Sequence, residues 1–294
     1  MTNGNGTTRK RPARSKKRLL KRLSHSTPRS AVTKRDKPMS RLEVHQFPCL
    51  SDNYGYLVHD PDSGLTATID TPEVEPIHAA LNARGWKLDF IFNTHHHDDH
   101  AGGNLELKTQ TGCQIIGPAA DADRIPGIDR TVAEGDSVML GAWSFTVHDT
   151  PGHTRGHIVY HCPQAGIGFV GDTLFALGCG RLFEGTPQQM WTSLQKILSW
   201  PNETLIYCAH EYTQANARFA LSVEPDNADL LSRNDDIDAA RQRGEPTVPT
   251  TLGLEKRTNP FLRPDSPHLQ QTIGLSGQPL VEVFARTREL KDQF

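Results

Sequence analysis

The chain has 294 residues, of which 36% are hydrophobic and 22% are charged, a globular composition with room for one large domain or two modest ones. The first 40 residues carry thirteen Lys/Arg and one acidic residue, a net charge of +12, whereas the other 254 carry nineteen Lys/Arg and 33 acidic residues, a net charge of −14. The acidic body excludes a protein that coats nucleic acid through a uniformly basic surface, and no apolar run approaches the ~18 residues that a membrane-spanning helix needs.

Residues 1–40 are predicted to be a disordered basic leader, because they hold too few apolar residues to offset the entropy lost on ordering. They lack the apolar stretch of a secretory signal, but their Arg/Ser-rich, acid-poor composition is typical of an organelle transit peptide. Two other interpretations stay open: a basic tail for nucleic acid or an anionic surface, and a solvated tail without function, with Met39 as the true start. Five scattered cysteines without a CxxC pair indicate a reducing compartment, so we expect the cytoplasm unless the leader is a transit peptide.

From residue 41 to 210, short apolar runs alternate with turns rich in Gly, Asp and His, the pattern of a layered α/β domain with its site at the strand ends. The predicted strands are Leu42–Phe47, Tyr54–Val58, Leu65–Ile69, Phe90–Phe92, Gln114–Ile116, Ser144–Val147, Ile158–His161, Ile167–Val170 and Leu205–Tyr207. Residues 211–294 are more charged and helical, and we interpret them as a smaller α-helical domain. The predicted helices of both parts are Pro72–Arg84, Gly103–Gln110, Met190–Leu198, Glu211–Val223, Asn227–Arg243 and Pro279–Lys291.

The most informative segment is the string THHHDDH at positions 94–100, which directly follows the apolar strand Phe90–Phe92. A strand before the string and a turn after it would send several of these side chains into one cavity. Imidazole and carboxylate groups are the usual ligands of borderline divalent metals. A lone histidine after a strand is more often structural, but three later strand ends also carry a ligand-type residue, at His153, Asp172 and His210. Together these segments indicate a metal site.

These residues resemble the metallo-β-lactamase fold family, whose first motif is HxHxDH. His95, His97, Asp99 and His100 match that motif, and His153, Asp172 and His210 match its later motifs. The resemblance covers residues 42–294 and implies an αββα sandwich with two divalent metal ions in a groove at one edge. It assigns His95, His97 and His153 to the first metal, Asp99, His100 and His210 to the second, and Asp172 to both. Zinc is the ion we expect, and iron or manganese are alternatives.

Other polar residues near the motif receive supporting roles. His96 and Asp98 interleave with the ligands and are expected to point away from the metals. His157 is expected to pack behind the site or to support a ligand. Asp70 closes a predicted strand, and it either orients a ligand imidazole or caps the helix that follows it.

Within the family, the chain is most similar to glyoxalase II, the hydroxyacylglutathione hydrolases. A helical C-terminal domain is a characteristic feature of that group. The similarity lies in the string at 94–100, the loop FALGCGRLFEGT at 175–186, HEYT at 210–213, NPFLR at 259–263 and RELKDQF at 288–294. It implies that Arg288 and Lys291 bind the glycine carboxylate of glutathione, although alone they would be interpreted as a solvated helix face. It places Arg181, Phe183 and Tyr212 against the peptide portion. Phe183 stands where the family often has Tyr, and Arg181 where it often has Lys, so both departures affect affinity.

The resemblance implies a monomeric binuclear thioester hydrolase that converts S-D-lactoylglutathione to glutathione and D-lactate, the second step of methylglyoxal detoxification. Asp99 and Asp172 are expected to act in catalysis with a hydroxide that the metals generate, and no membrane or nucleic-acid partner is expected for the body. Three alternatives are a mononuclear iron persulfide dioxygenase, a phosphodiesterase or nuclease, and a binding module that has lost its metals. The complete set of seven ligands argues against the first and third, and the acidic body argues against the second.

Overall fold

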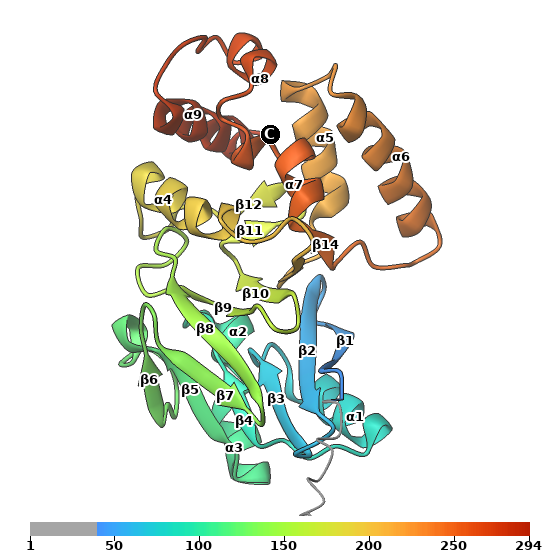
Figure 1. Ribbon diagram of the computed structural model, residues 1–294, viewed down its shortest axis with the longest axis vertical. Helices are drawn as coiled ribbons and strands as arrows, with labels where there is room; N and C mark the ends of the chain where they lie inside the picture. Colours follow the sequence, from blue (N-terminus) through green and yellow to red (C-terminus); the bar gives the residue numbers. More distant parts are fainter. Residues whose placement is uncertain (1–39) are drawn as a thin grey trace, which may run out of the picture. The chain divides into compact units, whose positions relative to one another are not determined.

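The computed structural model describes residues 40–294, so the predictions for the basic leader and for Met39 concern residues outside the described range. Within that range, two six-stranded sheets form the centre of the fold (Figure 1). Neighbours in the first sheet are antiparallel from β1 to β3 and parallel from β3 to β6. Its strands are, in spatial order, β1 (Glu43–Cys49), β2 (Asn53–Asp60), β3 (Leu65–Ile69), β4 (Phe90–Phe92), β5 (Gln114–Pro118) and β6 (Arg130–Val132).

The second sheet is antiparallel except where β10 runs parallel to β13. Its strands are, in spatial order, β14 (Thr250–Thr251), β13 (Leu205–Cys208), β10 (Ile167–Gly171), β9 (Ile158–Cys162), β8 (Trp143–Asp149) and β7 (Ser137–Leu140). A separate two-stranded hairpin pairs β11 (Leu174–Phe175) with β12 (Gly178–Cys179).

Three large apolar clusters hold the layers together. Phe92, Phe145 and Phe169 belong to the cluster between the two sheets. The helices α1 (Val74–Arg84) and α3 (Asn104–Thr111) cover the outer face of the first sheet, where Ile77 and Leu107 pack against its strands. The helix α4 (Pro187–Leu198) covers the second sheet. This layer order confirms the predicted αββα sandwich, because each sheet buries one face against the other and one against helices.

The remaining helices gather at the end of the fold away from α1 and α3 (Figure 1). Phe219, Phe261 and Phe284 from this part join the cluster that holds α4, and residues 40–294 all belong to one compact unit. No helix within residues 40–294 is both long and apolar enough to cross a bilayer. The helices at this end are α5 (Thr213–Val223), α6 (Ala228–Gln242), α7 (Leu252–Thr258), α8 (Pro267–Thr272) and α9 (Leu280–Asp292). The first half of the chain also holds the short helix α2 (Asp98–Ala101), and 3₁₀ turns occur at Ala119–Asp121 and Pro260–Leu262.

Candidate metal centre

Four strand ends carry the seven predicted ligands. After β4, the chain is extended at His97, and α2 then begins at Asp98, so that Asp99 and His100 occupy its first turn. The ends of β8, β10 and β13 supply the other three ligands, which are His153, Asp172 and His210. The change from strand to helix within six residues lets one short segment contribute to two neighbouring groups of ligands.

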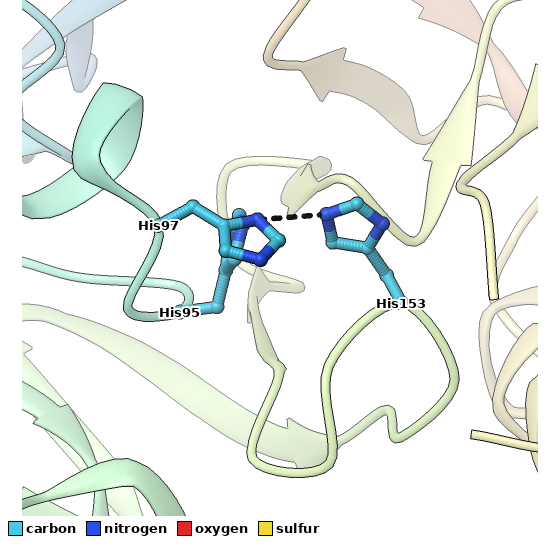
Figure 2. Close-up of side chains that lie close together, drawn as sticks. All are labelled: His95, His97 and His153. Carbon is cyan, nitrogen blue, oxygen red and sulfur yellow. Dashed lines mark hydrogen bonds between the residues drawn. The ribbon is translucent and has the colours of Figure 1, made fainter. Parts of the chain in front are cut away.

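The first group consists of His95, His97 and His153, which converge from two loops (Figure 2). His97 Nδ1 lies 3.0 Å from His95 Nε2 and 3.1 Å from His153 Nε2. Two nitrogens at ~2.05 Å from one tetrahedral zinc ion would be about 3.3 Å apart. The three imidazoles are therefore spaced as ligands of a single ion.

The second group consists of Asp99, His100 and His210. Asp99 Oδ2 lies 3.5 Å from the Nε2 atoms of both His100 and His210. Asp172 reaches both groups with different oxygens. Its Oδ1 lies 3.4 Å from the same two Nε2 atoms, whereas its Oδ2 lies 3.3 Å from His153 Nε2. This is the arrangement expected of a carboxylate that bridges two cations.

Two buried atoms at this place have no hydrogen-bond partner among the described residues: His100 Nε2 and Asp172 Oδ1. A buried polar atom without a partner is costly, and a native fold leaves few of them. Both atoms face the space between the ligands, and both are of the type that binds divalent metals. The donor set therefore fits two metal ions.

The charges differ between the two groups. Burial, followed by the neighbouring imidazoles, holds the pKa of His95 well below its usual value and lowers the pKa of His97 to about 4. At His100, burial alone would lower the pKa, but Asp172 and Asp70 outweigh it and raise the pKa well above its usual value. Despite its burial, the pKa of Asp172 is lowered by His100 and His210. The first group thus offers neutral imidazoles. In the second group the carboxylates favour the protonated form of the imidazole, and a bound metal ion would replace that proton.

Protein oxygens fix the outer nitrogens of the ligand imidazoles. Asp70 Oδ2 lies 2.8 Å from His100 Nδ1, and the cap position of α1 is Glu73 rather than Asp70. The same aspartate accepts hydrogen bonds from the backbone and hydroxyl of Thr94, whose hydroxyl lies 3.0 Å from His95 Nδ1. His153 Nδ1 donates to the carbonyl of Arg181, 3.0 Å away. Such partners set the tautomer and the ring orientation of a metal ligand.

His157 lies behind the site. Its Nε2 accepts a hydrogen bond of 3.0 Å from the backbone N–H of Asp172, and its ring stacks on His95 with centroids 4.8 Å apart. His96 and Asp98 both point away from the metals: His96 contacts Asp121, and the Asp98 side chain is exposed.

A cavity of about 520 Å³ opens beside the ligands and reaches α9. Tyr212 stacks on His210 with centroids 4.7 Å apart, and Phe183 lies 5.2 Å from His153 by the same measure. Arg288 is buried and donates to the carbonyl of Cys179 and to Asp292. Lys291 has no ion-pair partner within residues 40–294, and burial together with Arg288 and Arg181 lowers its pKa. The structure therefore brings the five predicted substrate-binding residues to the walls of one cavity, together with His97, Asp99, His153, Asp172 and His210.

Comparison with known proteins identifies the family. Residues 211–294 match a model described as hydroxyacylglutathione hydrolase C-terminus, and residues 62–210 match the metallo-beta-lactamase superfamily. A hydroxyacylglutathione hydrolase from Maricaulis maris (strain MCS10) is 57% identical over 256 residues, which are 87% of this chain and 100% of the relative. The chain belongs to the hydroxyacylglutathione hydrolase family.

Another hydroxyacylglutathione hydrolase, from Methylococcus capsulatus (strain ATCC 33009 / NCIMB 11132 / Bath), is 53% identical over 253 residues, with 86% of this chain and 99% of the relative covered. Among solved structures, ETHE1 from Myxococcus xanthus shares 26% identity at a TM-score of 0.61, over 84% of this chain and 90% of that one. The fold of the hydroxyacylglutathione hydrolase family implies a binuclear divalent metal site, which agrees with the two groups of ligands described above.

Sequence reasoning missed two residues that reach this site, one in the β1–β2 turn and one at the start of β2. Asp52 Oδ1 lies 2.8 Å from His210 Nδ1, and Asn53 donates a hydrogen bond of 3.2 Å to Asp99 Oδ2. The turn also joins the His210 segment through the backbone, because the N–H of Glu211 donates to the carbonyl of Asp52. Asp52 is 158 residues away from its histidine and stands in no motif, so nothing local in the sequence indicated it.

Proposed function

We propose that this chain is a binuclear metallohydrolase that cleaves S-2-hydroxyacylglutathione thioesters, above all S-D-lactoylglutathione, to glutathione and the hydroxy acid. The observation that carries the proposal is the cavity itself. Five of the seven predicted ligands line it, namely His97, Asp99, His153, Asp172 and His210, and Lys291 and Arg288 line it as well. An acyl group at the ligands and a peptide carboxylate at the cations would fit one elongated, anionic substrate.

The cofactors we propose are two zinc ions. His95, His97 and His153 would hold one, and Asp99, His100 and His210 would hold the other, with Asp172 shared between them. When bound, such ions lower the pKa of water toward ~7 and polarise a carbonyl oxygen. Nitrogen-rich ligands suit zinc, although affinity for iron or manganese is also expected from the same donors.

The surrounding residues complete the reaction site. The rings of Phe183 and Tyr212 stand beside His153 and His210 in the wall of the cavity. The leaving group is a thiolate with a solution pKa near ~8.5–9, so little help from a general acid is required. Burial raises the pKa of the Cys179 thiol, the cysteine that lines the cavity, to about 11. Cys179 therefore stays protonated at neutral pH and is not a competing nucleophile.

Lys291 is the cation best placed to receive the glycine carboxylate. The Nη atoms of Arg288 already donate to Cys179 and Asp292, whereas the ammonium group of Lys291 lies over the rings of Phe219 and Phe294. We therefore expect Arg288 to shape the end of the cavity and Lys291 to make the direct charge contact.

The decisive experiment is steady-state hydrolysis of S-D-lactoylglutathione, followed as loss of thioester absorbance, with metal content measured on the same sample. We expect two metal ions per chain and a kcat/KM within ~10⁴–10⁸ M⁻¹s⁻¹. Lys291→Gln should raise KM about tenfold, which corresponds to about 1.4 kcal/mol of binding, and leave kcat within about twofold. Lys87→Gln, an exposed lysine, is the matched control and should change neither constant. A sample that holds two metals and does not turn over would contradict the proposed substrate.

The location and the oligomeric state also stay proposals. Each of the five cysteines is free and buried, which supports a reducing compartment such as the cytoplasm. We propose a monomer, and light scattering of the purified chain at micromolar concentration would test it. A dimer mass would contradict this part of the proposal without affecting the reaction.

A further inference from the structure

A chain of charged contacts connects the loop at residues 175–186, here called the substrate loop, to the predicted ligands of the first metal. Its centre is Arg124, in the turn after the 3₁₀ segment Ala119–Asp121. The two Nη atoms donate to the two carboxylate oxygens of Glu184 at 2.5 and 3.0 Å, and Nη2 also donates to Asp121. Glu184 directly follows Phe183, a wall of the cavity. One guanidinium thus joins two carboxylates that are 63 residues apart in the sequence.

The inner carboxylate of this chain of contacts fixes the metal-binding string. Asp121 has no exposed surface, and its Oδ2 lies 3.0 Å from His96 Nδ1. On the opposite side of the ring, His96 Nε2 accepts from Arg124 Nη1 at 3.1 Å. Both ring nitrogens are therefore used, and the backbone of His96 is held between its neighbours, the ligands His95 and His97.

The same contacts fix the loop of His153. The hydroxyl of Thr154 lies 3.4 Å from Asp121 Oδ2, and the backbone N–H of Arg155 donates to Glu184 Oε2 at 2.8 Å. Asp121 also packs against Gly156 so closely that a Cβ at this glycine would overlap the carboxylate. The backbone segments on both sides of the first metal group are therefore set by one pair of carboxylates and one arginine.

We propose that Arg124 is a positioning residue for the reaction: it fixes the first metal's three histidines and the substrate loop as one unit. The proposal rests on the function proposed above for the same cavity. Arg124 belongs neither to the groups of ligands nor to the cavity lining, so it acts through His96, Asp121 and Glu184. Only a planar guanidinium can serve two carboxylates and an imidazole at once, because a lysine ammonium is a single point of charge.

The electrostatics support a well-formed connection rather than a loose surface contact. The hydrogen bond from Arg124 lowers the pKa of Glu184 to about 2, although 28% of the Glu184 side chain is exposed. The Asp121 side chain is completely buried, and Arg124 is the cation that pairs with it. Removing the partner of a buried charge is strongly destabilising, which is why variants on both sides of the connection are needed to test the proposal.

Three variants separate the two halves of the connection. Glu184→Gln weakens the bond to Arg124, keeps a carbonyl oxygen that can accept from the N–H of Arg155, and leaves Asp121 paired with Arg124. We therefore expect KM to rise about fivefold with metal affinity within about twofold of the parent chain. Arg124→Leu should raise KM similarly and also weaken binding of one zinc ion by about 10–100-fold, the usual effect of losing support behind a ligand. Arg124→Lys should lie between the two in metal affinity.

Zinc affinity is measured by competition with a chromophoric zinc chelator, which yields two binding constants and does not depend on turnover. Asp52→Asn is the reference variant for the second group of ligands, because Asp52 contacts His210. Asp52→Asn should weaken one of the two zinc binding constants, and Arg124→Leu should weaken the other. Arg243→Leu removes a remote exposed ion pair with Glu245 and should change neither.

The outcomes are distinguishable from a failure of the proposed function. If the parent chain does not hydrolyse the thioester, the zinc constants still test the positioning role. Arg124→Leu and Arg124→Lys chains that lose thermal stability but keep both zinc constants within twofold would show that Arg124 only stabilises the fold, and would overturn the proposal. Should Arg124→Leu fail to fold, an unchanged KM in Glu184→Gln together with parental zinc constants in Arg124→Lys would overturn it equally.

Discussion

At the scale of single residues, four of the five predicted ligand histidines combine one nitrogen directed to the metal centre with an outer nitrogen held by the protein; they are His95, His100, His153 and His210. His210 shows how this is achieved on a short loop. Asp52 holds its Nδ1 at 2.8 Å, and Tyr212 stacks on the ring with only 2° between the two planes. The ring is therefore fixed in both tautomer and tilt before any metal binds, which reduces the ordering required on binding.

We expect Asp52→Asn to weaken zinc binding at the second group by about 10–100-fold, because an amide no longer stabilises the correct tautomer of His210 as a carboxylate does. The measurement is metal content after dialysis against graded chelator concentrations. Asp235→Asn, an exposed aspartate on α6, is the control and should retain both metals. Retention of two metals by Asp52→Asn at the same chelator concentrations would show that Asp52 does not support this ligand.

The convergence of the seven predicted ligands at one place could be predicted from the sequence, whereas several of their supports could not. The ligands stand at strand ends in short motifs, so their spacing is visible locally. Asp52 and Asn53 reach the site only because β2 pairs next to β3 and brings the β1–β2 turn to the same edge. Arg124 is likewise defined by partners far away in the chain. Contacts of this kind depend on tertiary packing, which a single sequence does not reveal.

At the scale of elements, the strands with strong apolar runs were predicted within a few residues, and the weakly patterned ones were missed. The predicted Leu65–Ile69 and Phe90–Phe92 coincide with β3 and β4. β6, β7 and the β11–β12 hairpin were not predicted, because they are two to four residues long and take their stability from a neighbouring strand. Short α2 was also missed, since its residues were interpreted as ligands rather than as a turn of helix.

Helix α4 shows how local sequence places the substrate loop. Thr186 ends that loop and caps the helix: its hydroxyl accepts from the N–H of Gln189, while the Gln189 side chain accepts from the N–H of Thr186. Pro187 follows at the first helical position, where its missing N–H costs nothing. This reciprocal pair fixes where the loop stops and the helix begins.

We expect Thr186→Ala to destabilise the chain by about 1 kcal/mol, the usual cost of losing a threonine cap. The measurement is urea unfolding followed by circular dichroism. Thr192→Ala, on the exposed face of the same helix, is the matched control, and its effect should stay within ~0.5 kcal/mol. Equal effects of the two substitutions would show that the cap does not contribute.

At the scale of the whole molecule, the fold buries a histidine far from the metal ligands. His161 lies on β9 under Trp200, with the two rings stacked at 4.0 Å and 11°, and its Nε2 has no hydrogen-bond partner among residues 40–294. His148 is the titratable neighbour that faces it, with centroids 6.3 Å apart. Burial, with a smaller contribution from His148, lowers the pKa of His161 to about 4.

This lowered pKa makes stability depend on pH. Between about pH 6.5 and 4, the unfolded chain binds a proton at His161 that the folded chain does not, so the free energy of unfolding falls as the pH falls. The loss attributable to this residue should reach about 2 kcal/mol at pH 5 relative to pH 8. His161→Phe keeps an aromatic ring against Trp200 and removes the titration, so its stability should decline less over this range.

The test is urea unfolding of the parent chain and of His161→Phe at pH 8, 6 and 5, in the presence of a chelator so that acid release of metal does not contribute. His268→Gln, an exposed histidine on α8, serves as the control and should follow the parent chain. If His161→Phe lost as much stability as the parent between pH 8 and pH 5, the buried imidazole would not be the origin of the acid sensitivity. If His161→Phe lost less stability than the parent chain and His268→Gln did not, the acid sensitivity would be assigned to the histidine that packs against Trp200 rather than to the metal centre.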